Sequence, residues 1–155
     1  MSIVVTSVLN DLTGMRFVAR TASGHEVVMD ALPEVGGTDT GPRPGELPLV
    51  GLSACTGMDV ISILRKMRQP VTSFSVEVEG IHKATEHPKR WTELRVIFHL
   101  TGEVDRVKLE RAIDLSRTQY CSVAAMLKPQ TTIHYRYVLN GDLVDLPPAP
   151  EPAHP

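Results

Sequence analysis

The stretch that decides the fold is residues 47–68, LPLVGLSACTGMDVISILRKMR. Pro48 is tolerated only in the first turn of a helix, where its missing N–H would have no partner, so the helix begins near residues 44–47. The helix runs to Arg68 and is stopped by Pro70. Its apolar side chains lie on nearly every side, which is typical of a helix that is buried all round. A chain of 155 residues is small for surrounding such a helix, which favours burial by a second copy of the chain.

Short strands precede this helix, and longer strands follow it. Gly14 and Gly24 mark turns between three runs that are rich in strand-forming residues. After the helix, apolar and polar residues alternate in two long runs, which predicts half-buried strands. The expected elements, in chain order, are strands 2–9, 15–22 and 25–30, the long helix, strands 74–79 and 94–100, helices 105–116 and 119–127, and strand 131–139. Because hairpins dominate, we predict an α+β fold with mostly antiparallel sheets around the long buried helix.

The length predicts one domain, residues 1–143, followed by a Pro-rich tail, residues 144–155, that we expect to be disordered. The chain has 16 Lys and Arg against 18 Asp and Glu, so its net charge of −2 favours neither nucleic acid nor a membrane as a partner. We expect no apolar run to reach the length of a membrane span. The first residues lack the basic segment of a secretory signal, so we expect a cytoplasmic location, where a disulfide is usually catalytic or sensory.

The two cysteines carry the chemistry that the sequence suggests. Cys55 lies in Leu-Ser-Ala-Cys-Thr-Gly-Met-Asp (52–59), and Cys121 lies in Gln-Tyr-Cys-Ser-Val (119–123), both in expected helices. Two buried cysteines that lie apart would be inert small hydrophobic residues, whereas two that meet would form a reactive pair. The six histidines show no His-x3-His spacing, and no Cys-x2-Cys is present, so we expect no structural zinc site.

Longer motifs surround both cysteines. Gly-Pro-Arg-Pro-Gly-Glu-Leu (41–47) leads into the first, and Leu-Ser-Arg-Thr-Gln-Tyr-Cys-Ser-Val (115–123) contains the second. In this order they resemble the OsmC/Ohr family over roughly residues 10–140, and most of all its less characterised OsmC-like branch. The resemblance implies an intertwined homodimer, with two long central helices packed between sheets.

The resemblance also implies a thiol-dependent peroxidase with no bound cofactor. The cysteine matching Cys55 attacks an organic hydroperoxide and becomes a sulfenic acid. The cysteine matching Cys121 condenses with it to a disulfide, and an external dithiol reductant, lipoyl groups in particular, restores the thiols. In that family an arginine also stabilises the first thiolate, and a glutamate holds the arginine. The position of that glutamate, ten residues before the cysteine, is Gly45 in this chain, and Glu46 is the nearest candidate.

The arginine has three candidates, with Arg16 as the first choice and Arg20 and Arg43 as alternatives. Asp59 lies four residues after Cys55 on the same helical face, where a bare carboxylate would raise the pKa of the thiol. We therefore hypothesise that an arginine pairs with Asp59 and points at Cys55, so that Asp59 replaces the missing glutamate. The predicted catalytic residues are Cys55, Cys121, Arg16, Asp59 and Glu46.

The preferred function is therefore the reduction of organic hydroperoxides under oxidative stress. One alternative is a non-catalytic OsmC-like module that binds a small apolar molecule and leaves its thiols idle. Another is a thiol redox sensor or thiol transferase that uses the same cysteines. Rapid formation of a disulfide with peroxide would distinguish the peroxidase from the binding module.

Overall fold

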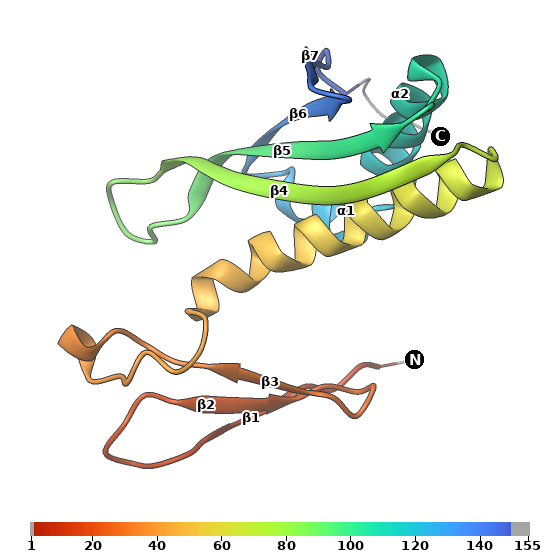
Figure 1. Ribbon diagram of the computed structural model, residues 1–155. Helices are drawn as coiled ribbons and strands as arrows, with labels where there is room; N and C mark the ends of the chain where they lie inside the picture. The colour runs from red at the N-terminus through yellow and green to blue at the C-terminus, as the bar shows by residue number, and fades with distance from the viewer. Residues whose placement is uncertain (1, 150–155) are drawn as a thin grey trace. The chain divides into compact units, whose positions relative to one another are not determined.

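The computed structural model describes residues 2–149, and the chain divides into two compact units with their boundary between Pro48 and Leu49. The first unit is an antiparallel sheet of β1 (Thr6–Leu9), β2 (Phe17–Arg20) and β3 (Glu26–Met29), followed by the short 3-10 helices η1 (Pro33–Val35) and η2 (Pro44–Glu46) (Figure 1). The three predicted strands are therefore present, each shorter than expected because the irregular turns between them take more residues.

The loop after β3 is held by one buried carboxylate, Asp30. Its Oδ2 accepts the hydroxyl protons of Thr38 at 2.7 Å and Thr40 at 2.8 Å. Its Oδ1 accepts the backbone N–H of Ala31 at 2.8 Å. The hydrogen bond from Thr38, with those from Thr40 and Ala31, holds the pKa of Asp30 far below its ordinary value. Asp30 therefore shapes the glycine-rich segment that leads toward the long helix.

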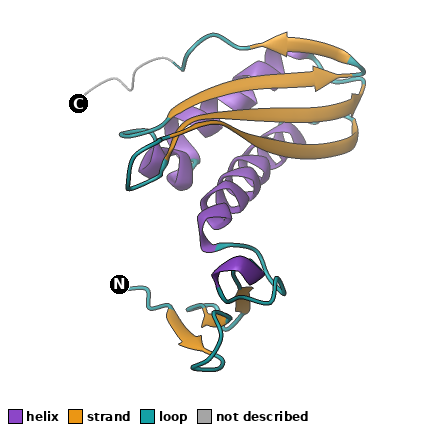
Figure 2. Cartoon of the chain, turned by 90° about the vertical axis from the view of Figure 1, so that its left-hand side faces the viewer, coloured by secondary structure: helices purple, strands orange, loops and turns teal. Residues whose placement is uncertain are grey.

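The second unit contains most of α1 (Leu47–Lys66) and a four-stranded sheet in the order β4-β5-β6-β7. Figure 2 shows the helices on one face of this sheet. The pair β5·β6 is parallel, and the other pairs are antiparallel. The remaining bounds are β4 (Val71–Lys83), β5 (Trp91–Gly102), α2 (Arg106–Leu115), the π-helical turn η3 (Ser116–Tyr120), α3 (Ser122–Leu127), β6 (Thr132–Leu139) and β7 (Asp142–Asp145).

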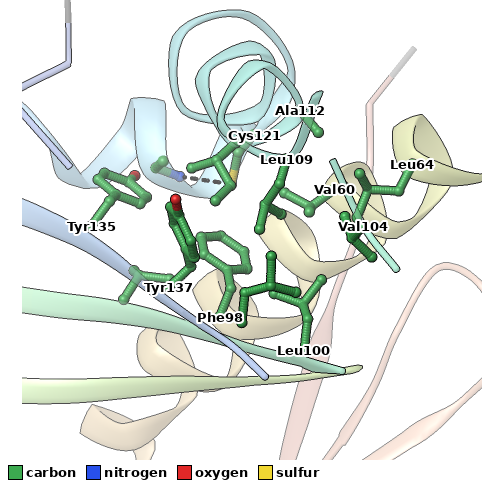
Figure 3. Close-up of a cluster of buried hydrophobic side chains, with 14 of the residues drawn as sticks. Val60, Leu64, Phe98, Leu100, Val104, Leu109, Ala112, Cys121, Tyr135 and Tyr137 are labelled. Atoms are coloured by element: carbon green, nitrogen blue, oxygen red, sulfur yellow. Dashed lines mark hydrogen bonds between the residues drawn. The ribbon is translucent and has the colours of Figure 1, made fainter. Parts of the chain in front are cut away.

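The hydrophobic core lies between α1, α2 and the sheet (Figure 3). Alternate residues of β5 point inward, as the sequence pattern predicts. On α1, by contrast, only one face is buried within the chain, because Val50 is 56% and Met58 is 70% exposed. The core side chains of α1, β5 and α2 are Leu52, Val60, Leu64, Leu94, Val96, Phe98, Leu100, Leu109, Ala112 and Ile113.

The expectation that no apolar run is long enough to span a membrane is wrong by length and composition. The helical segment Pro44–Lys66 has an 18-residue window of mean hydropathy 1.7, which meets the requirement for a membrane span. This is weak evidence for a membrane, because the core helix of a soluble protein satisfies the same test. Here Leu52, Val60 and Leu64 of that segment pack into the core.

The end of the chain departs from the prediction in two ways. The connection through α2, η3 and α3 returns the chain so that β6 runs parallel to β5, as crossover connections do. Asn140 and Gly141 then form a tight turn with φ of 52° and 92°, which pairs β7 with β6 and places residues 144–145 in a strand instead of a disordered tail. Residues 150–155 of the expected tail lie outside the described residues.

Candidate active site

The two cysteines come from different elements of the second unit and lie together. Cys55 is half-buried in the middle of α1, and Cys121 is 4% exposed at the start of α3. Their Sγ atoms and a carboxylate oxygen of Asp59 all lie within 4.8 Å of one another. The prediction that one site contains both Cys55 and Cys121 is confirmed, across a separation of more than sixty residues in the sequence.

The turn η3 presents Cys121 to α1. Its π-helical hydrogen bond runs from the N–H of Cys121 to the carbonyl of Ser116, at 2.9 Å. Cys121 then leaves the helical conformation, with ψ of 98°, and its Sγ accepts the N–H of Ala124 at 3.4 Å (Figure 3). Widened turns of this kind occur frequently at functional sites. The sequence predicted a helix here but gave no sign of the extra residue in the turn.

Asp59 is positioned by a short chain of hydroxyl groups. The hydroxyl of Ser116 donates to Oδ2 of Asp59 at 2.9 Å. Because a hydroxyl has a single proton, the 2.9 Å contact between Ser116 and Thr56 requires Thr56 to be the donor. Thr56 and Ser116 are both fully buried, so this chain fixes the carboxylate beside the two thiols. Neither hydroxyl could be recognised from the sequence, because 60 residues separate the two positions along the chain.

The environment distinguishes the two thiols. Burial raises the pKa of Cys121 to about 11, assisted by the contact with Cys55 and the charge of Asp59, although the N–H of Ala124 opposes the shift. Cys121 is therefore a neutral thiol at neutral pH. Cys55 is half-buried and Cys121 is buried, so the side chain of Cys55 is the more exposed of the two to solvent.

The predicted arginines Arg16 and Arg20 belong to the first unit. The guanidinium of Arg16 donates to Oδ1 of Asn10 at 3.1 Å. Arg20 pairs with Glu26 across β2 and β3 at 3.1 Å, and both side chains are exposed. Each arginine has a local partner within its own unit, and the predicted role of Arg16 beside Asp59 stays a prediction.

Arg43 and Glu46 hold each other at the entrance to α1. The carboxylate of Glu46 accepts the backbone N–H of Arg43 at 3.1 Å, and the guanidinium of Arg43 lies 3.7 Å from it. Arg43 also pairs with Asp39 at 2.8 Å. These contacts cap η2, so Glu46 has a structural role at the start of this turn. A catalytic role for Glu46 stays a prediction. Within residues 49–149, no arginine pairs with Asp59.

One buried arginine near the site was missed. Arg117 is 3% exposed, and its guanidinium donates to Asp114 at 2.7 Å and to the carbonyl of Pro147 at 2.7 Å. It also lies 5.5 Å from the centre of the Tyr135 ring. The backbone carbonyl of Arg117 accepts a hydrogen bond from the Lys128 ammonium group. Arg117 thus connects η3 to Tyr135 of β6 and to Pro147 after β7, and these contacts position Cys121.

Two cavities of about 570 and 550 Å³ open beside Asp59 and Cys121, and the exposed side chain of Tyr120 lines both. Asp59 lines the first together with apolar residues of α1, and Cys121 lines the second together with polar residues. Leu52 and Met58, which lie on either side of Cys55 in α1, line neither of these cavities. Leu52 is in the core, and Met58 faces a separate shallow groove.

Comparison with known proteins identifies the family. A model of the family described as OsmC-like protein matches residues 37–136. The chain belongs to the OsmC family. This OsmC-like protein is 35% identical over 125 residues to protein YhfA from Escherichia coli (strain K12), which covers 80% of the chain and 90% of YhfA. The prediction of an OsmC-like protein of the less characterised branch is confirmed.

Solved structures support the same assignment. A hypothetical protein from Aquifex aeolicus VF5 matches with a TM-score of 0.76 and 31% identity, over 90% of this chain and 97% of that one. An organic hydroperoxide resistance protein OsmC from Legionella pneumophila matches with a TM-score of 0.60 and 13% identity, over 90% and 96% of the two chains. The Legionella protein therefore shares the fold with the OsmC-like protein.

Proposed function

We propose that this OsmC-like protein is a cysteine-based peroxidase that reduces organic hydroperoxides. The observation that carries the proposal is the approach of Cys55 and Cys121, whose Sγ atoms lie within 4.8 Å, close enough for a small side-chain rotation to bring them into bonding distance. The name of the Legionella pneumophila protein, organic hydroperoxide resistance protein, supports this substrate class for the fold.

The reaction has three steps, and each cysteine has a defined part. The Cys55 thiolate attacks the outer oxygen of the hydroperoxide and breaks the O–O bond, so that Cys55 becomes a sulfenic acid. The remaining alkoxide leaves and takes up a proton to become an alcohol. The sulfur of Cys121 attacks the sulfur of Cys55 and expels water, which forms a disulfide. A dithiol, such as a lipoyl group, then reduces the disulfide by exchange and becomes oxidised itself.

The order of the two cysteines follows from burial and protonation. Cys55 is the more exposed thiol, whereas Cys121 is buried and its pKa is raised to about 11. Cys121 must lose its proton when it attacks the sulfenic acid. The carboxylate of Asp59, held by Ser116, lies within reach to accept that proton and pass it to the departing hydroxide. Asp59 is thus the proposed general base of the second step.

Further groups complete the proposal. Arg16 is the proposed cation beside Asp59, and an intertwined homodimer is the proposed assembly, in which a second copy covers the exposed apolar side chains of α1, Val50 and Met58 among them. The proposed location is the cytoplasm, where dithiol reductants are abundant. No partner of nucleic acid or membrane type is proposed.

A binding module without catalysis is the second candidate. It is favoured by one observation, the neutral Cys121 thiol beside an Asp59 that pairs with no cation within residues 49–149. A thiol without a nearby cation is a weak nucleophile. Such a protein would keep the cavities and leave its cysteines reduced. A redox sensor, the third candidate, would form the disulfide but turn over slowly.

The deciding experiment uses fully reduced, chelator-treated protein and one equivalent of cumene hydroperoxide. We expect rapid loss of two thiols and a Cys55–Cys121 disulfide by peptide mass spectrometry. Cys55→Ser should abolish thiol loss, and Cys121→Ser should accumulate a sulfenic acid that dimedone traps. Ser53→Ala, on the same helix, is the matched control and should behave like the wild type. Thiols that persist through excess peroxide in the wild type would refute the peroxidase and leave the binding module.

A further inference from the structure

Three side chains with metal-binding donors converge in the second unit. The Sγ atoms of Cys55 and Cys121 and one carboxylate oxygen of Asp59 lie within 4.8 Å of one another. Around a tetrahedral zinc ion, with bonds of about 2.3 Å to sulfur and about 2.1 Å to oxygen, such donors are about 3.5–3.8 Å apart. Side-chain rotations that move each donor by about 1 Å close the difference. We propose that Cys55, Asp59 and Cys121 form a binding site for a thiolate-preferring divalent cation, Zn²⁺ in particular.

The carboxylate among the three donors has no cation paired with it in the second unit, although Lys128 lines the cavity that Cys121 lines. Within residues 49–149, Asp59 forms no ion pair, and its one hydrogen bond is to the neutral hydroxyl of Ser116. The buried Arg117 is already paired with Asp114. Lys66 lines the same cavity as Asp59 but is exposed, and it forms no ion pair with Asp59 within residues 49–149. Asp59 is therefore a half-buried carboxylate beside two sulfur atoms, and no cation of the second unit pairs with it. These conditions suit the binding of a metal ion.

The surroundings orient the donors as the outer groups of a metal site do. Ser116 occupies Oδ2 of Asp59, which leaves Oδ1 available for an ion, and Thr56 in turn fixes Ser116. The N–H of Ala124 holds the Sγ of Cys121. Hydrogen bonds of this kind fix the rotamers of metal ligands and strengthen binding. Since Asp59 and Cys121 each line a cavity, and Tyr120 lines both, an ion has access from the surface.

Binding involves no oxidation or reduction. The ion forms bonds to two sulfurs and one oxygen, the two thiol protons leave to solvent, and the fourth tetrahedral position takes a water molecule. Because both sulfurs are then held by the metal, a metal-loaded site cannot form the Cys55–Cys121 disulfide. The inference does not depend on the peroxidase activity, since it uses only the geometry of the reduced thiols.

The test is a titration of reduced, full-length protein with Cd²⁺, whose bonds to thiolates produce an ultraviolet charge-transfer band. We expect the band to saturate at one ion per chain and to lose about half its intensity in Cys55→Ser. Competition for Zn²⁺ with a chromophoric chelator then gives the affinity. Asp59→Asn, which can still accept the proton of Ser116, should bind at least about tenfold more weakly. Asp142→Asn, an exposed carboxylate of β7, is the matched control and should bind like the wild type.

Two results would overturn the site. One is a wild-type titration with no band at one equivalent of Cd²⁺, and the other is an Asp59→Asn affinity equal to that of the wild type, which would remove the carboxylate from the donor set. Adding cumene hydroperoxide to metal-loaded and chelator-treated samples separates this inference from the proposed function. If the chelator-treated protein forms the disulfide but no metal binds, the peroxidase stands and the metal site is refuted. If metal binds but the chelator-treated protein forms no disulfide, the metal site stands and the peroxidase is refuted.

Discussion

Two tyrosines of β6 give opposite predictions for the same substitution. Tyr135 and Tyr137 are both almost completely buried in the core (Figure 3). The hydroxyl of Tyr135 has no hydrogen-bond partner among residues 2–149. The hydroxyl of Tyr137 donates to Glu110 at 2.8 Å. Replacing either residue with phenylalanine removes one oxygen atom and keeps the ring, so the two variants compare an unsatisfied hydroxyl with a satisfied one.

The magnitude follows from the cost of burying a polar group. A buried hydroxyl without a partner costs about 1–3 kcal/mol, so Tyr135→Phe should raise the free energy of unfolding by about 1–2 kcal/mol. The contact of the ring with Arg117 is retained, since it involves the aromatic face. Tyr137→Phe removes a hydrogen bond to a carboxylate and should lower the free energy of unfolding by about 1.5–3 kcal/mol.

The assay is urea unfolding of both variants and the wild type at one protein concentration, because association of subunits would make the midpoint depend on concentration. The slope of the free energy against urea should stay constant, so that a shifted midpoint reports stability alone. A decrease of about 1 kcal/mol or more in the free energy of unfolding of Tyr135→Phe would contradict the prediction, since the hydroxyl would then have a stabilising partner.

Three other predictions concern the site and its frame. The pKa of Cys121 in the folded protein, about 11, lies above the ordinary thiol value of 9.0, so the folded state keeps this proton to a higher pH than the unfolded state does. The free energy of unfolding should therefore fall as the pH rises from about 9 to about 11. Urea midpoints across this range check the prediction, and Cys121→Ala is the control that should lack this pH dependence. Ser116→Ala should lower the free energy of unfolding by about 1–3 kcal/mol, because Asp59 and Thr56 both lose a buried hydrogen-bond partner. Ser116→Thr keeps a hydroxyl and should recover part of this loss. An alanine variant as stable as the wild type would contradict the chain of hydroxyl groups. Asn140→Ala should lower the free energy of unfolding by about 1–3 kcal/mol, because Asn140 has φ of 52° and its side chain forms hydrogen bonds with both the N–H and the carbonyl of Gly102. Thermal unfolding of this variant, with Asn10→Ala as the control, tests the prediction. Equal losses of stability in the two variants would count against it.

Local patterns were sufficient for the elements that build the second unit. The apolar stretch of α1 and the proline at Pro48 predicted that helix closely, and alternation predicted β4 and β5. β7 was missed although its signal was present, since Asn140-Gly141 is a strong hairpin turn; the prolines that follow hid it. The parallel pairing of β5 with β6 needs the path of the crossover in space, which no local pattern contains.

The candidate site was predicted only in part, for a physical reason. Cys55 and Asp59 share one helical face, so their proximity follows from helix geometry. The pairing with Cys121 came from a family resemblance, since no local rule relates residues so far apart. Ser116, Thr56 and Arg117 act through contacts between α1, η3 and the residues after β7, and these contacts exist only once the core has formed.

The two proposals for the site make opposing predictions for one residue, Arg16. In the peroxidase, a guanidinium beside Asp59 would stabilise the Cys55 thiolate, so Arg16→Met should slow the reaction with peroxide. A metal ion would compete with that guanidinium for the same carboxylate, because both need its oxygen atoms. Arg16→Met should therefore bind Zn²⁺ more tightly than the wild type. Arg106→Met, the control with an exposed ion pair of its own to Asp142, should change neither property. Slower peroxide reaction together with unchanged zinc affinity would mean that Arg16 assists the thiol without contacting Asp59. Unchanged values for both would remove Arg16 from the site and leave the metal ion as the remaining proposed cation for Asp59.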